Sequence, residues 1–354
     1  MSNVFNHPWL AGLFGDAEAA VIWSPEQHLT HMLAFESALT RSMGEVGSVP
    51  INIANNLADQ ITVFQVDLDD LHRGSARDGL PVPALVSQLR KMAGDNSNAV
   101  HTGATSQDVI DTALSLTLRE FNALLHKRLT DTVEAIAKLQ NRFGPKTLMG
   151  RTRMQAALPI TVASRLRTWS DPLQNHLERL ERLRPRVELL QLGGAVGDRA
   201  AFSQNAADIA AHMAAELGLG NPETSWHATR DGLADYANLL SLISGSVGKI
   251  GQDICLMAQQ GIDEIGMTTG GGSSAMPHKQ NPILAELLVT LARYNATQLS
   301  GMHQALVHEH ERSGAAWALE WMVLPDMARA TARSLSAFSD VCAQIEWIGA
   351  RPHQ

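Results

Sequence analysis

The stretch GGGSSAMPHKQNP at residues 270–282 combines residue types that suit proton transfer beside an anion. Its glycines predict a flexible hinge, and Asn281, followed by a proline, predicts the N-cap of a helix. Free N–H groups at a helix start attract anions, and Lys279 adds a positive charge beside them. A serine hydroxyl is a poor base unless its alkoxide is stabilised, and such a field would stabilise the alkoxide of Ser273 or Ser274. A glycine-rich linker would explain the glycines alone, but the whole string favours a lid that closes over carboxylates.

A second polar stretch, HTGATSQDVIDTA at residues 101–113, predicts a capped helix start. Thr105 or Ser106 can act as the N-cap, and Asp108 occupies the matching position of a capping box. Hydroxyl groups at a helix N-terminus favour a bound carboxylate, and His101 could act there as an acid or base. Taken alone, such a pattern is more often an ordinary capped helix than a site.

A third stretch, GRTRMQAALP at residues 150–159, carries groups that could hold anions. Arg151 and Arg153 offer positive charge for carboxylates, and Gln155 offers an amide. A solvated basic turn explains the same residues at least equally well.

A fourth stretch, HQALVHEHERSG at residues 303–314, contains three histidines and two glutamates, which invites a metal site. Its spacing argues against one, because His308 and His310 lie two residues apart and diverge on a helix. We therefore expect no metal site. Arg312 is the better candidate for contact with an anion.

Helical patterns predict the elements that position these stretches. Ser24 fits an N-cap with Pro25 at the first helical position, and Gly44 fits the end of that helix. A helical region covers about 52–73, and Gly94 ends a short helix before a polar break. No run alternates in the way that strands require, so we expect an all-α fold. The longer segments expected to be helical cover about 106–141, 159–190, 203–217, 231–264, 282–308 and 325–346.

The length of these segments predicts a long central bundle. The polar break divides the chain into an N-terminal helical domain at 1–98 and a bundle domain at 99–354. Within the bundle, Gly245, Gly248 and Gly251 lie three residues apart, where a neighbouring helix could approach closely.

Composition narrows the partners of the protein. With 28 basic and 36 acidic residues the net charge is −8, so neither a nucleic acid nor an anionic membrane is expected as a partner. Charged residues make up only 18%, which fits a protein that buries surface against copies of itself. Two cysteines in apolar stretches predict buried free thiols in a reducing compartment, and the start of the sequence has no signal-peptide pattern. A cytoplasmic protein is therefore expected.

Three of the stretches together resemble the fumarase/aspartase superfamily. GGSSAMPHKQNP resembles its signature loop, usually GSSxMPxKxNP, and HTGATSQDVIDTA resembles its first shared region. GRTRMQAA resembles the second region, usually GRTHxQxA. Their order and spacing also match, so the resemblance covers nearly the whole chain.

The resemblance implies a mostly helical homotetramer in which each active site draws regions from three subunits. Its members catalyse β-elimination, or the reverse, on succinyl-type substrates without a cofactor. The catalytic roles it implies fall on Ser273 as general base, on Lys279 and on His101. Residues expected to bind the substrate are Thr105, Ser106, Arg151, Arg153, Gln155, Ser274, Met276, Asn281, His310 and Arg312.

Arg153 distinguishes the branches of this superfamily. The adenylosuccinate lyases have a histidine there as general acid, and the cycloisomerase branch lacks it. GATSQDVIDTA, SSAMPHKQNP and HERSGAAWALEW look most like the cycloisomerases that convert 3-carboxy-cis,cis-muconate, a tricarboxylate of protocatechuate degradation, to a lactone. A related muconate such as a sulfonated one, an adenylosuccinate-type β-elimination, and a non-catalytic helical scaffold are the alternatives. Many relatives continue into a third helical domain, so the resemblance implies that this domain is truncated or absent here.

Overall fold

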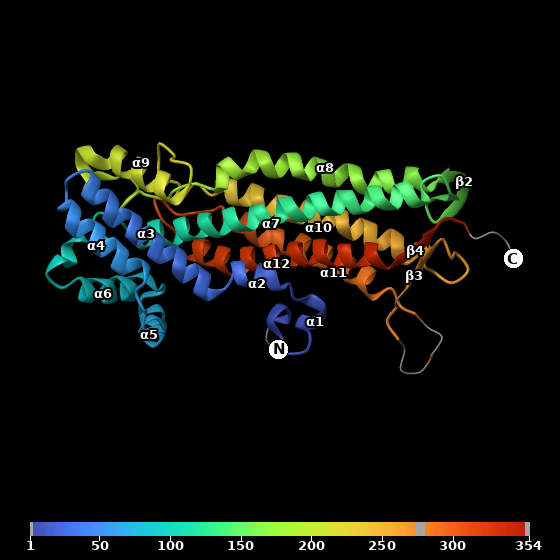
Figure 1. Cartoon of the computed structure of the whole chain (residues 1–354), viewed down its shortest axis with the longest axis horizontal. Coiled ribbons are helices and arrows are strands. Elements are labelled where there is room, and N and C mark those ends of the chain that lie inside the picture. The colour runs from blue at the N-terminus through green and yellow to red at the C-terminus, as the bar shows by residue number, and fades with distance from the viewer. Residues whose placement is uncertain (1–2, 269, 273–275, 277–279, 351–354) are drawn as a thin grey trace.

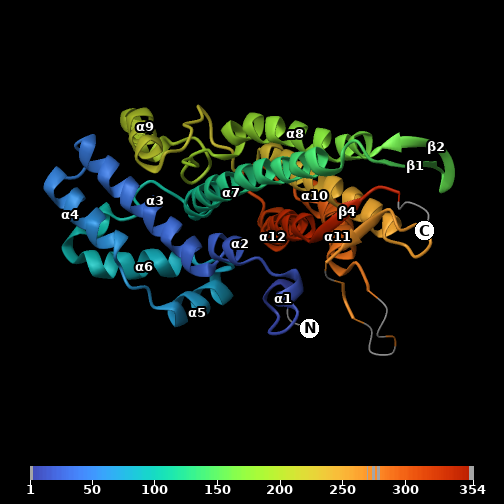
Figure 2. The ribbon, with the colours of Figure 1, turned by 45° about the vertical axis from the view of Figure 1, so that its right-hand side comes forward.

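The computed structural model describes residues 3–268, 270–272, 276 and 280–350. The molecule is elongated, and long helices run side by side along it (Figure 1). Shorter helices gather at one end, and the strands lie at the other (Figure 2). The fold is predominantly helical, as the sequence predicts.

The long helices form the central bundle. They are α7 (Ser106–Phe143), α8 (Val162–Val187), α10 (Asp231–Met257), α11 (Ile283–Gln304) and α12 (Gly314–Gln344). Side-chain caps begin several of them; the Ser313 hydroxyl, for example, accepts a hydrogen bond from the backbone N–H of Ala316 at the start of α12. The 38 residues of α7 span about 57 Å at 1.5 Å per residue, which sets the length of the bundle.

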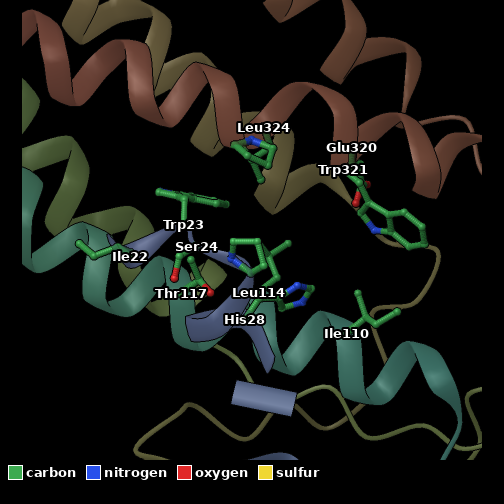
Figure 3. Close-up of a pocket in the computed structure, with 12 residues that line it drawn as sticks. Ile22, Trp23, Ser24, His28, Ile110, Leu114, Thr117, Glu320, Trp321 and Leu324 are labelled. Carbon is green, nitrogen blue, oxygen red and sulfur yellow. The ribbon is translucent and has the colours of Figure 1, made fainter. Parts of the chain in front are cut away.

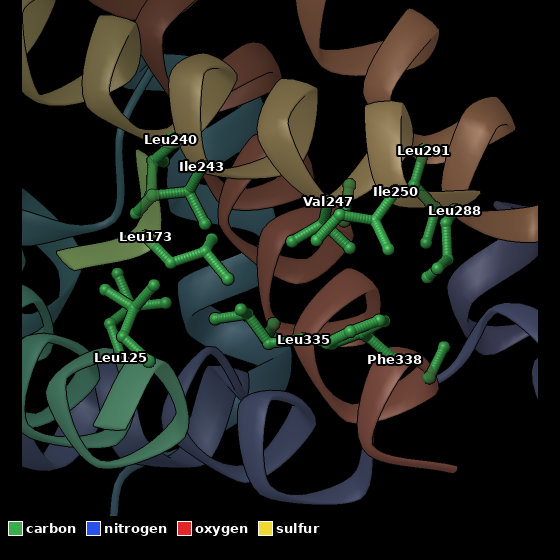
Figure 4. Close-up of a cluster of buried hydrophobic side chains, with 14 of the residues drawn as sticks. Leu125, Leu173, Leu240, Ile243, Val247, Ile250, Leu288, Leu291, Leu335 and Phe338 are labelled. Atoms are coloured by element: carbon green, nitrogen blue, oxygen red, sulfur yellow. The ribbon is translucent and has the colours of Figure 1, made fainter. Parts of the chain in front are cut away.

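Apolar side chains from all five of these helices meet in one core (Figure 4). Leu125 of α7 and Leu173 of α8 face Ile243 of α10, and all three are fully buried. Leu288 of α11 and Phe338 of α12 continue the core along the bundle. Because burying each such side chain contributes roughly 1.5–3 kcal/mol, this seam holds the bundle together.

A second core lies at the end of the bundle where α7 begins. It is built mainly from α3 (Pro25–Glu45), α4 (Ile51–Thr62), α6 (Val82–Ala93), the start of α7 and α9 (Ala206–Leu217). Helices from the first quarter of the chain therefore share a core with a segment about 200 residues into it. The division of the chain at residue 98 stays a prediction.

Short helices complete the described chain. They are α1 (Ala11–Phe14), α2 (Ala17–Ile22), α5 (Leu68–Asp78) and the 3-10 helices Val4–Asn6, Gly94–Ala99 and Ala200–Asn205. In the part of the chain that the structure describes, no helix is long and apolar enough to cross a membrane. The two cysteines are free thiols but half-buried, where the sequence predicts full burial.

The all-α fold class is confirmed, but the expectation that no run forms a strand is wrong at two places. Strands β1 (Thr147–Thr152) and β2 (Gln155–Thr161) form an antiparallel hairpin, and β3 (Ile265–Met267) pairs with β4 (Ile345–Ile348). Almost all of β2 is exposed, so it lacks the alternation of buried and exposed residues by which a strand is identified from sequence.

Several predicted helix ends also differ. Gly44 lies inside α3, where a side chain would meet Ala54 of α4, so it serves close packing instead of ending the helix. The region expected to be helical over 52–73 is two helices, α4 and α5. Helix α12 begins eleven residues before the predicted 325, because proline at 325 is accommodated within it. The predicted start of α3 at Ser24 is confirmed, since its hydroxyl accepts from the N–H of Gln27.

Candidate active site

The N-terminus of α7 is fixed by the carboxylate of Asp108. This buried carboxylate accepts the backbone N–H of Thr105, the N-cap residue, at 3.0 Å. It also accepts the N–H groups of Gly193 and Gly194 at 2.7 and 2.9 Å, and the ring of His227 lies 2.8 Å away. The predicted capping box is confirmed, and the same carboxylate ties a distant loop to the helix start.

His101 precedes this helix start and pairs with Glu36 of α3. Its Nδ1 lies 2.6 Å from Oε1 of that glutamate, whose side chain is fully buried. Burial opposes the charge, but the carboxylate of Glu36 and its hydrogen bond outweigh it and raise the pKa of His101. The histidine also has a positive φ of 59°, a strained conformation that the surrounding contacts must hold. The pair is thus a fixed acid or base beside Thr105 and Ser106.

Arg312 reaches the same helix start from the connection between α11 and α12. Its Nε donates to Oε1 of Gln107 at 2.9 Å, and Nη2 donates to the carbonyl of Ala195 at 3.3 Å. The residue itself is exposed, whereas Gln107 is fully buried. His310 lies nearby in sequence, exposed and with a positive φ of 47°. His101, Thr105, Ser106 and Arg312 therefore belong to one end of the bundle.

A buried ion cluster lies beneath this end. Arg230 donates to Asp111 at 2.7 and 3.1 Å and to Glu320 of α12 at 2.9 Å. Although burial opposes the charge, both carboxylates raise the pKa of Arg230, and Arg230 in turn lowers the pKa of Glu320. Breaking such a buried pair by removing one partner leaves an uncompensated charge, so the cluster is a rigid support.

The hairpin at the other end carries the arginines of the third stretch. Nη1 of Arg151 lies 2.6 Å from Glu264, which is buried and also accepts the N–H of Met149. Arg153 and Gln155 are exposed. A cavity of about 530 Å³ adjoins the hairpin, and most of the charged side chains that line it are cationic. The lining cations are Arg151, Arg153, Arg165 and Lys249, against the carboxylates Asp253 and Glu264. This excess of positive charge suits an anionic ligand.

The two ends of residues 270–282, the signature stretch, lie side by side. Gly271 and Asn281 exchange backbone hydrogen bonds of 2.8 and 3.0 Å in an antiparallel bridge. A side chain on Gly271 would meet Ile283, so this glycine permits close approach of the two arms. Asn281 is not the predicted N-cap, because Pro282 holds that position and the helix begins one residue later.

The remaining candidates of this stretch are only partly described. Met276 is 43% exposed. Ser273, Ser274 and Lys279 lie outside the residues that the structure describes, so their roles stay predictions.

The candidate residues thus separate into two groups. His101, Thr105, Ser106, His310 and Arg312 lie where α7 begins, at one end of the bundle. The hairpin and the base of the signature stretch lie at the opposite end (Figures 1 and 2). With α7 about 57 Å long, one copy of the chain cannot bring the two groups to a single small ligand.

An apolar cavity of about 290 Å³ lies between α2, α3, α7 and α12 (Figure 3). Trp23, Leu114 and Trp321 line it, with the half-buried His28. Burial lowers the pKa of His28 to about 4, with help from His31, so this imidazole is neutral at pH 7. No lysine or arginine is among the described residues of its lining, so the cavity does not suit a tricarboxylate.

The buried partners of the α7 helix start are functional candidates that the sequence does not reveal. They are Gln107, Asp111, His227, Arg230 and Glu320. Asp108 and Asp111 lie three apart in the first turns of α7, on either side of two apolar residues, which signals buried polar groups. Most of their partners, however, are 80 or more residues away in the sequence. Among the described residues, no three side chains of the metal-binding types are grouped to hold an ion.

These features define a class: a long-helix bundle with cationic and polar side chains grouped at both ends. The chain belongs to the lyase family, whose model matches residues 27–295. It is 37% identical over 342 residues to the 3-carboxy-cis,cis-muconate cycloisomerase of Pseudomonas aeruginosa, covering 95% of this chain and 74% of that protein. It is 32% identical to the N-acetyl-S-(2-succino)cysteine lyase of Enterococcus italicus, over 96% of this chain and 75% of that one.

A solved structure agrees with this family. The 3-carboxy-cis,cis-muconate lactonizing enzyme of Pseudomonas putida superposes with a TM-score of 0.89 at 33% identity. The match covers 96% of this chain and 77% of the other.

Proposed function

We propose that this protein is a cycloisomerase that closes 3-carboxy-cis,cis-muconate to a carboxymuconolactone in protocatechuate degradation. The observation that carries the proposal is the 37% identity to a cycloisomerase over 95% of the chain. Arg153 supports it, because this position holds an arginine where the adenylosuccinate branch uses a histidine as general acid.

The reaction is an intramolecular addition. One carboxylate oxygen of the substrate forms a C–O bond to the double bond, and the adjacent carbon takes up one proton. In this proposal Ser273 donates that proton, while Lys279 and Arg312 hold the other carboxylates beside the helix starts. Read in reverse, the leaving group is a carboxylate, which needs little help from an acid. That is why a histidine at position 153 is dispensable.

The proposed active form is a cytoplasmic homotetramer with shared sites. Two groups of candidate residues at opposite ends of a bundle about 57 Å long would meet only between copies of the chain. The hairpin supports such contacts, since Met154 and Leu158 are each 74% exposed. Large apolar side chains left exposed in this way mark a surface that another chain covers.

The test is an ultraviolet assay of the purified protein with 3-carboxy-cis,cis-muconate. Adenylosuccinate and N-acetyl-S-(2-succino)cysteine run in parallel as substrates of the lyase alternatives. Rapid loss of diene absorbance, with the two other substrates untouched, is expected. Cleavage of either succinyl substrate with the diene unchanged would reject the cycloisomerase and favour β-elimination.

The serine is tested by Ser273→Ala in the same assay. Turnover is expected to fall by at least about 100-fold, because general acid–base groups contribute 10²–10⁴-fold to rates. An unchanged melting temperature would show that the fold is kept. A Ser273→Ala protein with near-normal turnover would remove Ser273 from the mechanism.

A further inference from the structure

Resting on the proposed function, we infer that Gln107 is a positioning residue that orients Arg312 toward a substrate carboxylate. Gln107 is the second residue of α7 and has no exposed surface. Its amide oxygen accepts from Nε of Arg312 at 2.9 Å, and its amide nitrogen donates to Asp111 at 3.1 Å and to the carbonyl of His227 at 3.0 Å. Every hydrogen-bonding position of the amide but one acceptor lone pair is therefore used.

The partners fix the orientation of this amide. The nitrogen side faces a carboxylate and a carbonyl, which only accept, and the oxygen faces a guanidinium, which only donates. Asp111 is itself held by Arg230 at 2.7 Å in the buried ion cluster. The amide consequently cannot rotate without breaking bonds to a rigid support.

The consequence for Arg312 is a guanidinium anchored along one edge. Nε is held by Gln107 and Nη2 by the carbonyl of Ala195, whereas Nη1 has no hydrogen-bond partner among the described residues. A fixed, planar donor beside the N-terminus of α7 suits recognition of one carboxylate. Orienting it in advance lowers the entropic cost of binding.

The chain offers a matched control in Gln191. This glutamine is equally buried and donates to the same oxygen of Asp111, at 3.3 Å, but its oxygen accepts from Ser225 and Trp226 instead of Arg312. Gln107→Met and Gln191→Met therefore remove similar support from Asp111. Only the first removes the contact with Arg312.

The experiment compares kcat and KM of these two variants, and of Arg312→Met, with 3-carboxy-cis,cis-muconate. Gln107→Met is expected to raise KM by about 10- to 100-fold with little change in kcat, the effect of losing one hydrogen bond to a charged group. Gln191→Met should stay within about threefold of wild type. The double variant of Gln107 and Arg312 should be no worse than Arg312→Met alone. Equal kinetic losses in both glutamine variants, or wild-type kinetics in Gln107→Met or Arg312→Met, would overturn the inference.

A second measurement separates this inference from the proposed function. If the wild-type protein does not turn over 3-carboxy-cis,cis-muconate, the proposed function fails. Crystal structures of the two glutamine variants then test the positioning role of Gln107 by itself. A guanidinium of Arg312 displaced in Gln107→Met but not in Gln191→Met supports the positioning role. An Arg312 that stays in place in both rejects it.

Discussion

At the scale of single residues, His101 and Glu36 form a largely buried titratable pair just before the helix start of α7. Removing the negative charge by Glu36→Gln is expected to lower the pKa of His101, since that carboxylate is what outweighs burial. The measurement is an NMR titration of the histidine side chains, with His101→Gln used to assign the resonance. Glu120→Gln, which alters the comparable pair with His31, is the control and should leave His101 unchanged.

The same pair makes stability depend on pH with a definite sign. The folded-state pKa of His101 lies above the unfolded value of about 6.5, so the folded protein binds the proton more tightly. Its contribution is fully present below that value and is lost as pH rises through the folded-state pKa. The urea midpoint of the wild type should therefore fall across this window, and the fall should be smaller in Glu36→Gln. An identical pH dependence in both proteins would contradict the argument.

At the scale of elements, two glycines of α10 show how closely the bundle helices pack. A side chain on Gly248 would lie 2.3 Å from Cβ of Ala292 in α11, whereas Gly245 has open space around it. Gly248→Ala is expected to destabilise by about 1–3 kcal/mol through overpacking. Gly245→Ala should stabilise by about 0.4–1 kcal/mol, because alanine loses less chain entropy in a helix.

Urea unfolding of both variants makes the comparison. Equal changes in the two would show that helix propensity, and not contact with α11, decides the effect. A destabilised Gly245→Ala protein would instead place another chain against this face of α10.

The helices could be predicted because their signals are local. Ser24 caps α3, and Asp108 accepts from Thr105 three residues earlier, as the capping patterns indicate. The β1–β2 hairpin could not be predicted, because its two-residue turn consists of Arg153 and Met154. Both have positive φ, which asparagine and glycine normally provide. Neither residue type signals a turn.

The interior of the site could not be predicted for a related reason. Asp108 binds Gly193 and Gly194, and Asp111 binds Arg230, each across 80 or more residues of sequence. No local pattern says which distant residue satisfies a buried carboxylate. The sequence identified Arg312 as a cation near the site but not the glutamine that holds it.

At the scale of the whole molecule, the length of the bundle decides how a site can be assembled. His101 and Arg312 lie at one end, and Arg151 lies at the other, with α7 spanning about 57 Å between them. A site that uses both groups must take them from different copies of the chain. This requirement can be tested without knowing the geometry of the assembly.

The test is complementation between inactive variants. His101→Gln and Arg151→Met are each expected to lose most activity, and co-assembly of equal amounts should restore about a quarter of it. Each site then has an even chance of a wild-type residue from each end, if subunits mix at random. His101→Gln mixed with Arg312→Met is the control. These two residues lie at the same end of the chain, so each site takes both of them from one copy. Every site in this mixture therefore contains one wild-type and one mutated side chain. Restored activity in the control, or none in the first mixture, would mean that sites are not divided between the two ends of different chains.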